Sequence, residues 1–129
     1  MTVFEHYVVA FALFLIIDGL WIKFSVDKFY KSQLGGLMRA KPDYLAGGIF
    51  YLLYILALEI FVVNPALGQN SYSYLIGHAA LLGVAMYGTY DLTARATIKN
   101  WPLKVTIIDM IWGTLATIVV SLLAFVIFR

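Results

Sequence analysis

The chain has 129 residues, of which 63% are hydrophobic and only 12% charged, and its formal net charge is +2. This composition excludes a soluble globule with a polar surface, and the absence of cysteine excludes disulfides, thiolate metal ligands and cysteine nucleophiles. We therefore expect one integral membrane domain over residues 1–129 that contacts the lipid bilayer and binds no nucleic acid.

Four apolar segments are long enough to cross a bilayer of about 30 Å, which takes about 20 helical residues. They cover residues 3–24, 45–64, 72–97 and 103–128. Glu5 and His6 precede the first apolar run in place of a basic region, so we expect that run to be retained rather than cleaved as a signal peptide. Backbone groups in lipid must be satisfied within each helix, which predicts an all-α antiparallel four-helix bundle.

Lys and Arg are distributed unequally between the two sides of this bundle. Eight of the nine lie in or beside the first and third connections: Lys23, Lys28, Lys31, Arg39, Lys41, Arg95, Lys99 and Lys104. Only Arg129 lies on the other side. The positive-inside rule then predicts that these two connections are cytoplasmic and that both termini are outside.

The first connection, residues 25–44, has an amphipathic pattern. Its apolar residues recur at helical spacing and are Val26, Phe29, Tyr30, Leu34, Leu37 and Met38, set against Asp27, Lys28, Lys31 and Gln33. This pattern predicts an interfacial segment that is interrupted at Gly35-Gly36 and ends at Pro42. It is either a lid over the cytoplasmic mouth or an anchor on anionic lipid, and the basic character favours the anchor.

The second and third helices each carry one polar group in their outer half. Asn64-Pro65 is expected to end the second helix, and the short connection that follows makes the two helices neighbours. Glu59 and His78 then lie at similar depth. We predict that they form a structural pair, with a proton relay as the alternative.

The cytoplasmic end of the third helix places Tyr87, Asp91 and Arg95 one turn apart on one stripe. Asp91 and Arg95 either form a simple ion pair or belong to a site. The fourth helix begins after Trp101-Pro102. Its small and polar stripe predicts an inward face and comprises Thr106, Asp109, Gly113, Ala116 and Thr117.

The pattern Ile-Ile-Asp-x-x-Trp occurs twice, at 16–21 and at 107–112. Residues three apart share a helix face, so each copy directs an acid and an indole to one side. Because the first helix runs inward and the fourth runs outward, Asp18 and Asp109 should share the cytoplasmic half of the membrane, where Asp91 joins them. The repeat does not match the helix pairing of an inverted-repeat transporter, so we interpret the copies as two walls of one site.

We therefore predict a polar, aromatic-lined intramembrane pocket that faces the cytoplasm. Its candidate residues are Asp18, Trp21, Tyr51, Tyr54, Tyr87, Tyr90, Asp91, Arg95, Asp109 and Trp112. Three carboxylates in a low dielectric cannot all ionise, so the pocket should exchange a proton or hold a divalent cation such as Mg²⁺, with Arg95 and Lys99 near a phosphate. In the structural alternative, Asp18 and Asp109 accept hydrogen bonds from Tyr and Trp side chains.

Three functions stay open at this point. The favoured one is binding or transport of a small amphipathic or cationic solute. The alternatives are a membrane-embedded enzyme acting on a lipid or isoprenoid, and a scaffold subunit or homo-oligomer that docks through the apolar outer half of the fourth helix. The chain has no zincin, P-loop, Rossmann or nucleophile-elbow pattern.

Four motifs spread over nearly the whole chain carry a resemblance to a known family. They are FYxxQLGG at 29–36, FYLLY at 50–54, YGTYDLT at 87–93 and WPLxVTxxDxxWG at 101–113. With them, the chain resembles a family of small bacterial predicted membrane proteins of unknown function. The resemblance implies a four-helix protein of the bacterial inner membrane, and it implies no activity. In that membrane, the positive-inside rule places both termini in the periplasm.

Single cysteines test the predicted orientation. We expect an impermeant thiol reagent to label Ser71→Cys but not Ser32→Cys in intact cells, because residue 71 lies in the outer connection and residue 32 in the basic inner one. Labelling of Ser32→Cys in intact cells would contradict the predicted orientation and indicate the opposite one.

Overall fold

Four long helical stretches make up the part of the chain that the computed structural model describes, residues 2–129. The first comprises α1 (Val3–Ser25), the π-helical turn η1 (Val26–Tyr30), α2 (Lys31–Leu34) and the 3₁₀ turn η2 (Gly35–Leu37). The second comprises α3 (Tyr44–Leu58), the π-helical turn η3 (Glu59–Val63) and α4 (Asn64–Gln69), and it is followed by α5 (Tyr72–Thr97) and α6 (Leu103–Phe128). The predicted all-α four-helix architecture is confirmed.

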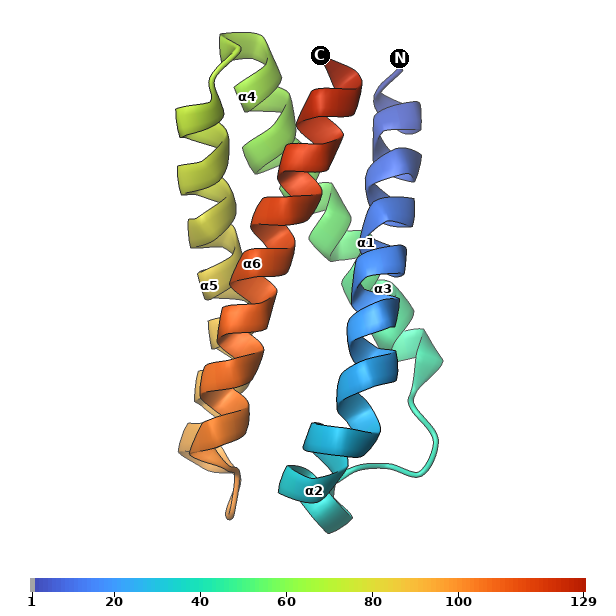
Figure 1. Cartoon of the computed structure of the whole chain (residues 1–129), viewed down its shortest axis with the longest axis vertical. Helices are drawn as coiled ribbons and strands as arrows, with labels where there is room; N and C mark the ends of the chain where they lie inside the picture. Colours follow the sequence, from blue (N-terminus) through green and yellow to red (C-terminus); the bar gives the residue numbers. More distant parts are fainter. Residues whose placement is uncertain (1) are drawn as a thin grey trace.

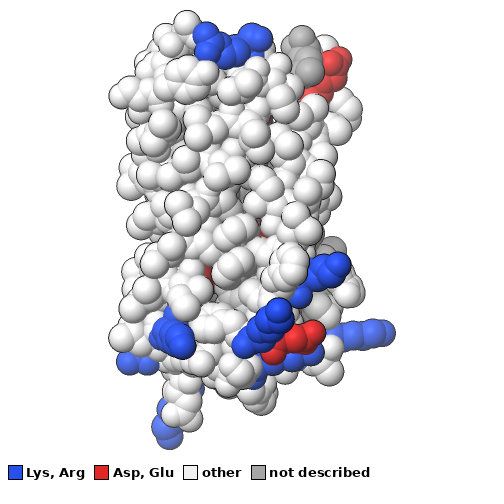
Figure 2. All heavy atoms as spheres, in the orientation of Figure 1, with Lys and Arg blue, Asp and Glu red and all other residues white. Residues whose placement is uncertain are grey.

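Charged and apolar surfaces are separated along the bundle. Lys and Arg gather at the end that carries α2, and on the face drawn an almost uncharged belt separates them from the end where both termini lie (Figures 1 and 2). We call these the basic end and the terminal end. Three stretches are long and apolar enough to span a membrane, namely Val3–Leu37, Tyr44–Gln69 and Leu103–Phe128. The fourth, α5, has 26 residues but is more polar, so its crossing of the membrane stays a prediction.

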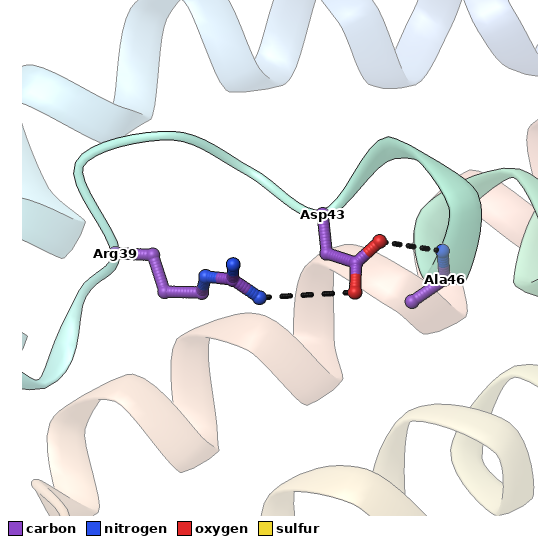
Figure 3. Close-up of polar contacts among 3 residues, drawn as sticks. All are labelled: Arg39, Asp43 and Ala46. Atoms are coloured by element: carbon purple, nitrogen blue, oxygen red, sulfur yellow. Dashed lines mark hydrogen bonds and ion pairs between the residues drawn. The ribbon is translucent and has the colours of Figure 1, made fainter.

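Polar side chains define where the second and third stretches begin. Asp43 caps α3 by accepting a hydrogen bond from the Ala46 N–H (3.1 Å), and its other oxygen lies 3.7 Å from Arg39 Nη1 (Figure 3). Ser71 caps α5 in the same way, by accepting from the Tyr74 N–H at 3.0 Å. Both caps satisfy backbone donors that the first helical turn leaves free.

The second stretch does not end at Asn64-Pro65, so that prediction is wrong. Pro65 lies in the first turn of α4, directly after the π turn η3, and helix continues to Gln69. A proline is tolerated in a first turn because its missing N–H would be unpaired there. The stretch ends instead where Asn70 adopts a left-handed conformation (φ 49°).

The closest helix contact in the bundle joins α5 to α6 through glycines. A Cβ atom at Gly83 would lie 2.7 Å from the Thr114 Cα, and one at Gly113 would lie 2.1 Å from the Tyr87 ring. Small residues are what allow helix backbones to approach closely in a membrane. This contact fixes the rotation of α5 and so decides which of its side chains face inward.

We expect Gly83→Ala to lower the free energy of unfolding by about 1–3 kcal/mol, the usual effect of overpacking a tight contact. Gly77→Ala is the matched control on the same helix, because nothing lies within 4 Å of a Cβ there. The measurement is unfolding of the purified protein in mixed micelles. Equal stability of the two variants would contradict the contact.

Candidate functional site

Asp18 lies where three helices meet. It sits on α1, is 8% exposed, and accepts a hydrogen bond from the Tyr51 hydroxyl on α3. Trp112 on α6 donates from Nε1 to its other oxygen at 3.4 Å. Both carboxylate oxygens therefore have a donor from another helix, which is how an acid in an apolar bundle is stabilised.

Asp109 on α6 accepts its hydrogen bond from the segment that follows α1. Tyr30, the last residue of η1, donates its hydroxyl proton to Asp109 Oδ1 at 2.6 Å. The same hydroxyl accepts a hydrogen bond from Trp21 Nε1 at 3.2 Å. Tyr30 thus links the Trp of the first Ile-Ile-Asp-x-x-Trp copy to the acid of the second.

The two indoles lie between these acids. Trp21 and Trp112 stack with ring centroids 4.5 Å apart and an interplanar angle of 7°. Because α1 and α6 run in opposite directions (Figure 1), each Trp lies beside the acid of the other copy, directly for Trp112 and through Tyr30 for Trp21. The two copies face each other, and the hydrogen bonds of the structural alternative are present.

Asp91 on α5 has no such partner. It is fully buried, and within residues 2–129 neither of its oxygens accepts a hydrogen bond. The Asp109 carboxyl on α6 lies within electrostatic range of it. The ion pair with Arg95, one of the two alternatives left open by the sequence, is not formed; Arg95 Nη1 instead donates to the Trp101 carbonyl at 2.5 Å. The two neighbouring acids therefore lack a neutralising positive charge among the described side chains.

The remaining predicted site residues divide between the core and the surface. Tyr54 is fully buried and its hydroxyl shares a hydrogen bond with Thr117 Oγ1. The Tyr87 ring lies against Gly113 and edge-on to Tyr54, with centroids 6.4 Å apart. Tyr90 is 59% exposed and packs against Trp101 on the outside. Tyr54 and Tyr87 therefore belong to the core, whereas Tyr90 and Arg95 are exposed.

The predicted open pocket is not seen at these acids. Two shallow grooves lie on the surface. One, of about 230 Å³, is lined by Phe4, Glu5, Val8 and Val9, and the other, of about 320 Å³, by Val84, Met110, Ile111, Thr114 and Leu115. Neither reaches an aspartate, because aromatic side chains fill the space between the acids. Within residues 2–129, no three His, Asp or Glu side chains are grouped to hold a metal ion.

The predicted pair of Glu59 and His78 is wrong. His78 is exposed, its ring stacks on Tyr74 at 3.7 Å, and its Nδ1 lies 2.9 Å from the Tyr74 carbonyl oxygen. Glu59 is 2% exposed, and neither oxygen has a hydrogen-bond partner in the described part of the chain. The close α5–α6 contact turns His78 outward. Similar depth in the membrane was therefore not sufficient to bring His78 and Glu59 together.

Sequence reasoning missed one contributor to the site, Tyr30, and one buried hydroxyl elsewhere in the core, Ser121. Tyr30 was assigned to the apolar face of an interfacial segment, although its hydroxyl bonds Asp109. In the sequence, only the position of Tyr30 on that apolar face could have indicated that it is buried. Its inward direction depends on the π turn η1, which the sequence pattern does not predict. Ser121 lies one turn after Thr117 on the predicted inward stripe of α6, and this spacing could have identified it.

Comparison with known proteins identifies one family. The family described as Predicted membrane protein (DUF2177) matches residues 3–126. No curated protein and no solved structure matches the chain.

Removing the Tyr30 hydroxyl tests the hydrogen-bonded cluster. We expect Tyr30→Phe to lower the free energy of unfolding by about 1–3 kcal/mol, because the Trp21 N–H and one Asp109 oxygen both lose their partner. Tyr44→Phe is the control at the same end, since Tyr44 is 77% exposed. Unfolding in micelles gives the stability, and near-UV circular dichroism reports the Trp21–Trp112 stack. A Tyr30→Phe variant as stable as the control would contradict the cluster.

Proposed function

Since the chain belongs to the family Predicted membrane protein (DUF2177), we propose that it is a membrane protein that binds a small amphipathic cation between its helices, near the basic end. The observation that carries this proposal is the fully buried Asp91 carboxyl, whose two oxygens have no hydrogen-bond partner and which no cationic side chain among the described residues neutralises. Half-buried Asp109 lies within electrostatic range of it. Of the other predicted site residues, Trp21, Trp112 and Tyr51 accompany Asp18 and Asp109, whereas Tyr90 and Arg95 take no part.

The charge balance of the two acids supports a cationic ligand. Two neighbouring carboxylates in a low dielectric repel each other, so at least one must hold a proton or face a cation. Lys and Arg are abundant at this end, but none forms an ion pair with either acid in residues 2–129. A cation that enters therefore gains attraction from both acids and replaces a proton.

The surrounding rings support an amphipathic ligand rather than a bare ion. Trp21 and Trp112 present a stacked pair of indoles beside Asp18 and Asp109. Indole faces attract cations, and the attraction grows when water is excluded. An apolar wall with a few acids is the lining that suits a cation with an organic body.

Access to these acids involves the segment between α1 and α2. Tyr30 and Trp21 are only half-buried, and Tyr30 belongs to a π-helical turn, a form often found at functional sites. Displacement of Tyr30 from Asp109 would free an acceptor for the incoming cation. The structure then corresponds to the closed form, in which Tyr30 occupies the position of the ligand.

The basic end belongs in the cytoplasm under this proposal. Eight of nine Lys and Arg residues lie in or beside the connections at that end, which the positive-inside rule assigns to the cytoplasmic side of a bacterial inner membrane. The site then takes its ligand from the cytoplasm.

Benzyltrimethylammonium, a small monocation with one aromatic ring, is a suitable probe. We expect it to quench tryptophan fluorescence of the protein in nanodiscs, and to bind more tightly as pH rises because protons compete for the same acids. Asp109→Asn should weaken binding at least tenfold and reduce the pH dependence, since it removes one charge and keeps the shape.

Asp27→Asn is the matched control for this experiment. Asp27 is an exposed acid at the same end, paired with Lys31 at 2.7 Å, and its loss changes the net charge by the same amount. Equal affinities of wild type and Asp109→Asn would exclude the proposed site. Native mass spectrometry of the nanodiscs would identify a ligand that copurifies.

A further inference from the structure

The segment that follows α1 is packed on protein. Its apolar side chains Phe29, Tyr30 and Leu34 contact a small buried cluster at the α5–α6 turn, which includes Trp101 (6% exposed). An anchor held by lipid alone would bury such side chains in the membrane interface instead. The segment is therefore docked on the bundle, and its outward-facing residues form a surface together with those of the α5–α6 turn.

Docking brings lysines from two separate connections to this shared surface. Lys104, in the first turn of α6, has its Nζ 6.0 Å from the centroid of the Phe29 ring. Lys28 directly precedes Phe29, Lys99 lies in the α5–α6 turn, and all three lysines are exposed. We call Lys28, Lys99 and Lys104 the lysine surface. It belongs to the end where Lys and Arg gather in Figure 2.

The charges of the lysine surface are not neutralised by acids among residues 2–129. The ion pairs at the basic end join Lys31 to Asp27 and Arg39 to Asp43, and neither pair includes a lysine of this surface. Docking therefore brings uncompensated positive charges together, and their repulsion opposes it. An anion that contacts both connections would offset this repulsion and favour the docked segment.

Exposed apolar side chains flank these lysines. Ile98 precedes Lys99 and is 42% exposed, and Leu103 precedes Lys104 and is 53% exposed. Phe24, near the end of α1, is 61% exposed. This combination suits the boundary between acyl chains and headgroups, because a lysine can lay its stem along apolar groups and place its ammonium at a phosphate. A soluble anion would gain nothing from the apolar side chains.

We infer that the lysine surface binds the phosphate groups of anionic phospholipids, and that these lipids hold the segment that follows α1 on the α5–α6 turn. In the predicted orientation this end meets the cytoplasmic leaflet, whose anionic lipids attract basic segments. Tyr30 belongs to the docked segment, so the lipids also stabilise its hydrogen bond to Asp109. The inference concerns lysines and phosphates, and it does not depend on a cation at the acids.

Lipid titration tests the binding. Native mass spectrometry of the protein in a neutral detergent should show tighter binding of phosphatidylglycerol than of phosphatidylcholine with the same acyl chains, because only the first has a net charge. The double variant Lys28→Gln/Lys104→Gln should bind phosphatidylglycerol at least tenfold more weakly and phosphatidylcholine as wild type does. Equal binding of the two lipids by wild type would overturn the inference.

The double variant Lys23→Gln/Lys41→Gln is the matched control. Both lysines are exposed at the same end, but Lys23 lies on α1 and Lys41 in the connection to α3, which runs away from the α5–α6 turn in Figure 1. The control should keep the phosphatidylglycerol affinity of wild type. An equal loss in the two double variants would indicate general charge attraction and refute the lysine surface. Because all four side chains are exposed, both variants should fold as wild type, which near-UV circular dichroism checks.

A distance measurement tests the docking. The chain has no cysteine, so spin labels on Ser32→Cys and Thr97→Cys report only the separation of the segment from α5. In nanodiscs that contain phosphatidylglycerol we expect one short, narrow distance, and in phosphatidylcholine nanodiscs a broader distribution that extends to longer distances. Adding Lys28→Gln/Lys104→Gln should abolish this difference. Identical distributions of the labelled wild type in the two lipids would contradict the role of the lipids in docking.

Inorganic phosphate distinguishes a lipid headgroup from a soluble anion. Added to phosphatidylcholine nanodiscs, it should leave the distance distribution broad, because it lacks the acyl chains that the exposed apolar side chains contact. Narrowing by inorganic phosphate to the same extent as by phosphatidylglycerol would assign the lysine surface to a soluble anion and overturn the lipid inference.

Discussion

The arrangement of the bundle depends on the need of its buried acids for partners, because lipid offers no hydrogen-bond donor. Asp18 obtains donors from α3 and α6, and Asp109 obtains one from the segment after α1. These bonds can form together only if α1 and α6 lie side by side with the two Ile-Ile-Asp-x-x-Trp copies facing each other. The stacked indoles fill the space between the copies, so the repeat determines both the pairing and the register of the first and last helices.

Two π-helical turns position polar side chains that lie outside the Ile-Ile-Asp-x-x-Trp repeat. A π turn accommodates one more residue than an α turn and so changes the direction of the side chains that follow. Tyr30 closes η1 and reaches Asp109, while Glu59 opens η3 and enters the core. In η3 the wide turn directly precedes Pro65, where an ordinary helix interior would be broken. The same local irregularity therefore lets the second stretch continue and buries an acid within it.

Hydropathy and spacing predicted most of the fold but only part of the site. The bounds 72–97 and 103–128 agree with α5 and α6, and the bound 3–24 differs from α1 by one residue. The pairing of Glu59 with His78 failed because the rotation of α5 depends on a glycine contact with α6, which local sequence does not reveal. The contact of Tyr30 with Asp109 and the helix that continues past Pro65 were not predicted for a similar reason. Each depends on a π turn, and no residue pattern predicts where such a turn forms.

Four acids lie within the bundle, of which Asp18, Asp91 and Glu59 are buried and Asp109 is half-buried. They are satisfied to very different degrees, and this inequality is the best physical guide to their roles. Asp18 has two donors, Asp109 has one, and Asp91 and Glu59 have none among the described residues. Buried charges can often be replaced by apolar side chains of similar volume without loss of stability, so holding four helices together does not require these acids. Asp18 and Asp109 contribute to the fold through their bonds. Asp91 and Glu59 have no such bonds, and an acid without partners inside a membrane bundle is by default a candidate functional group.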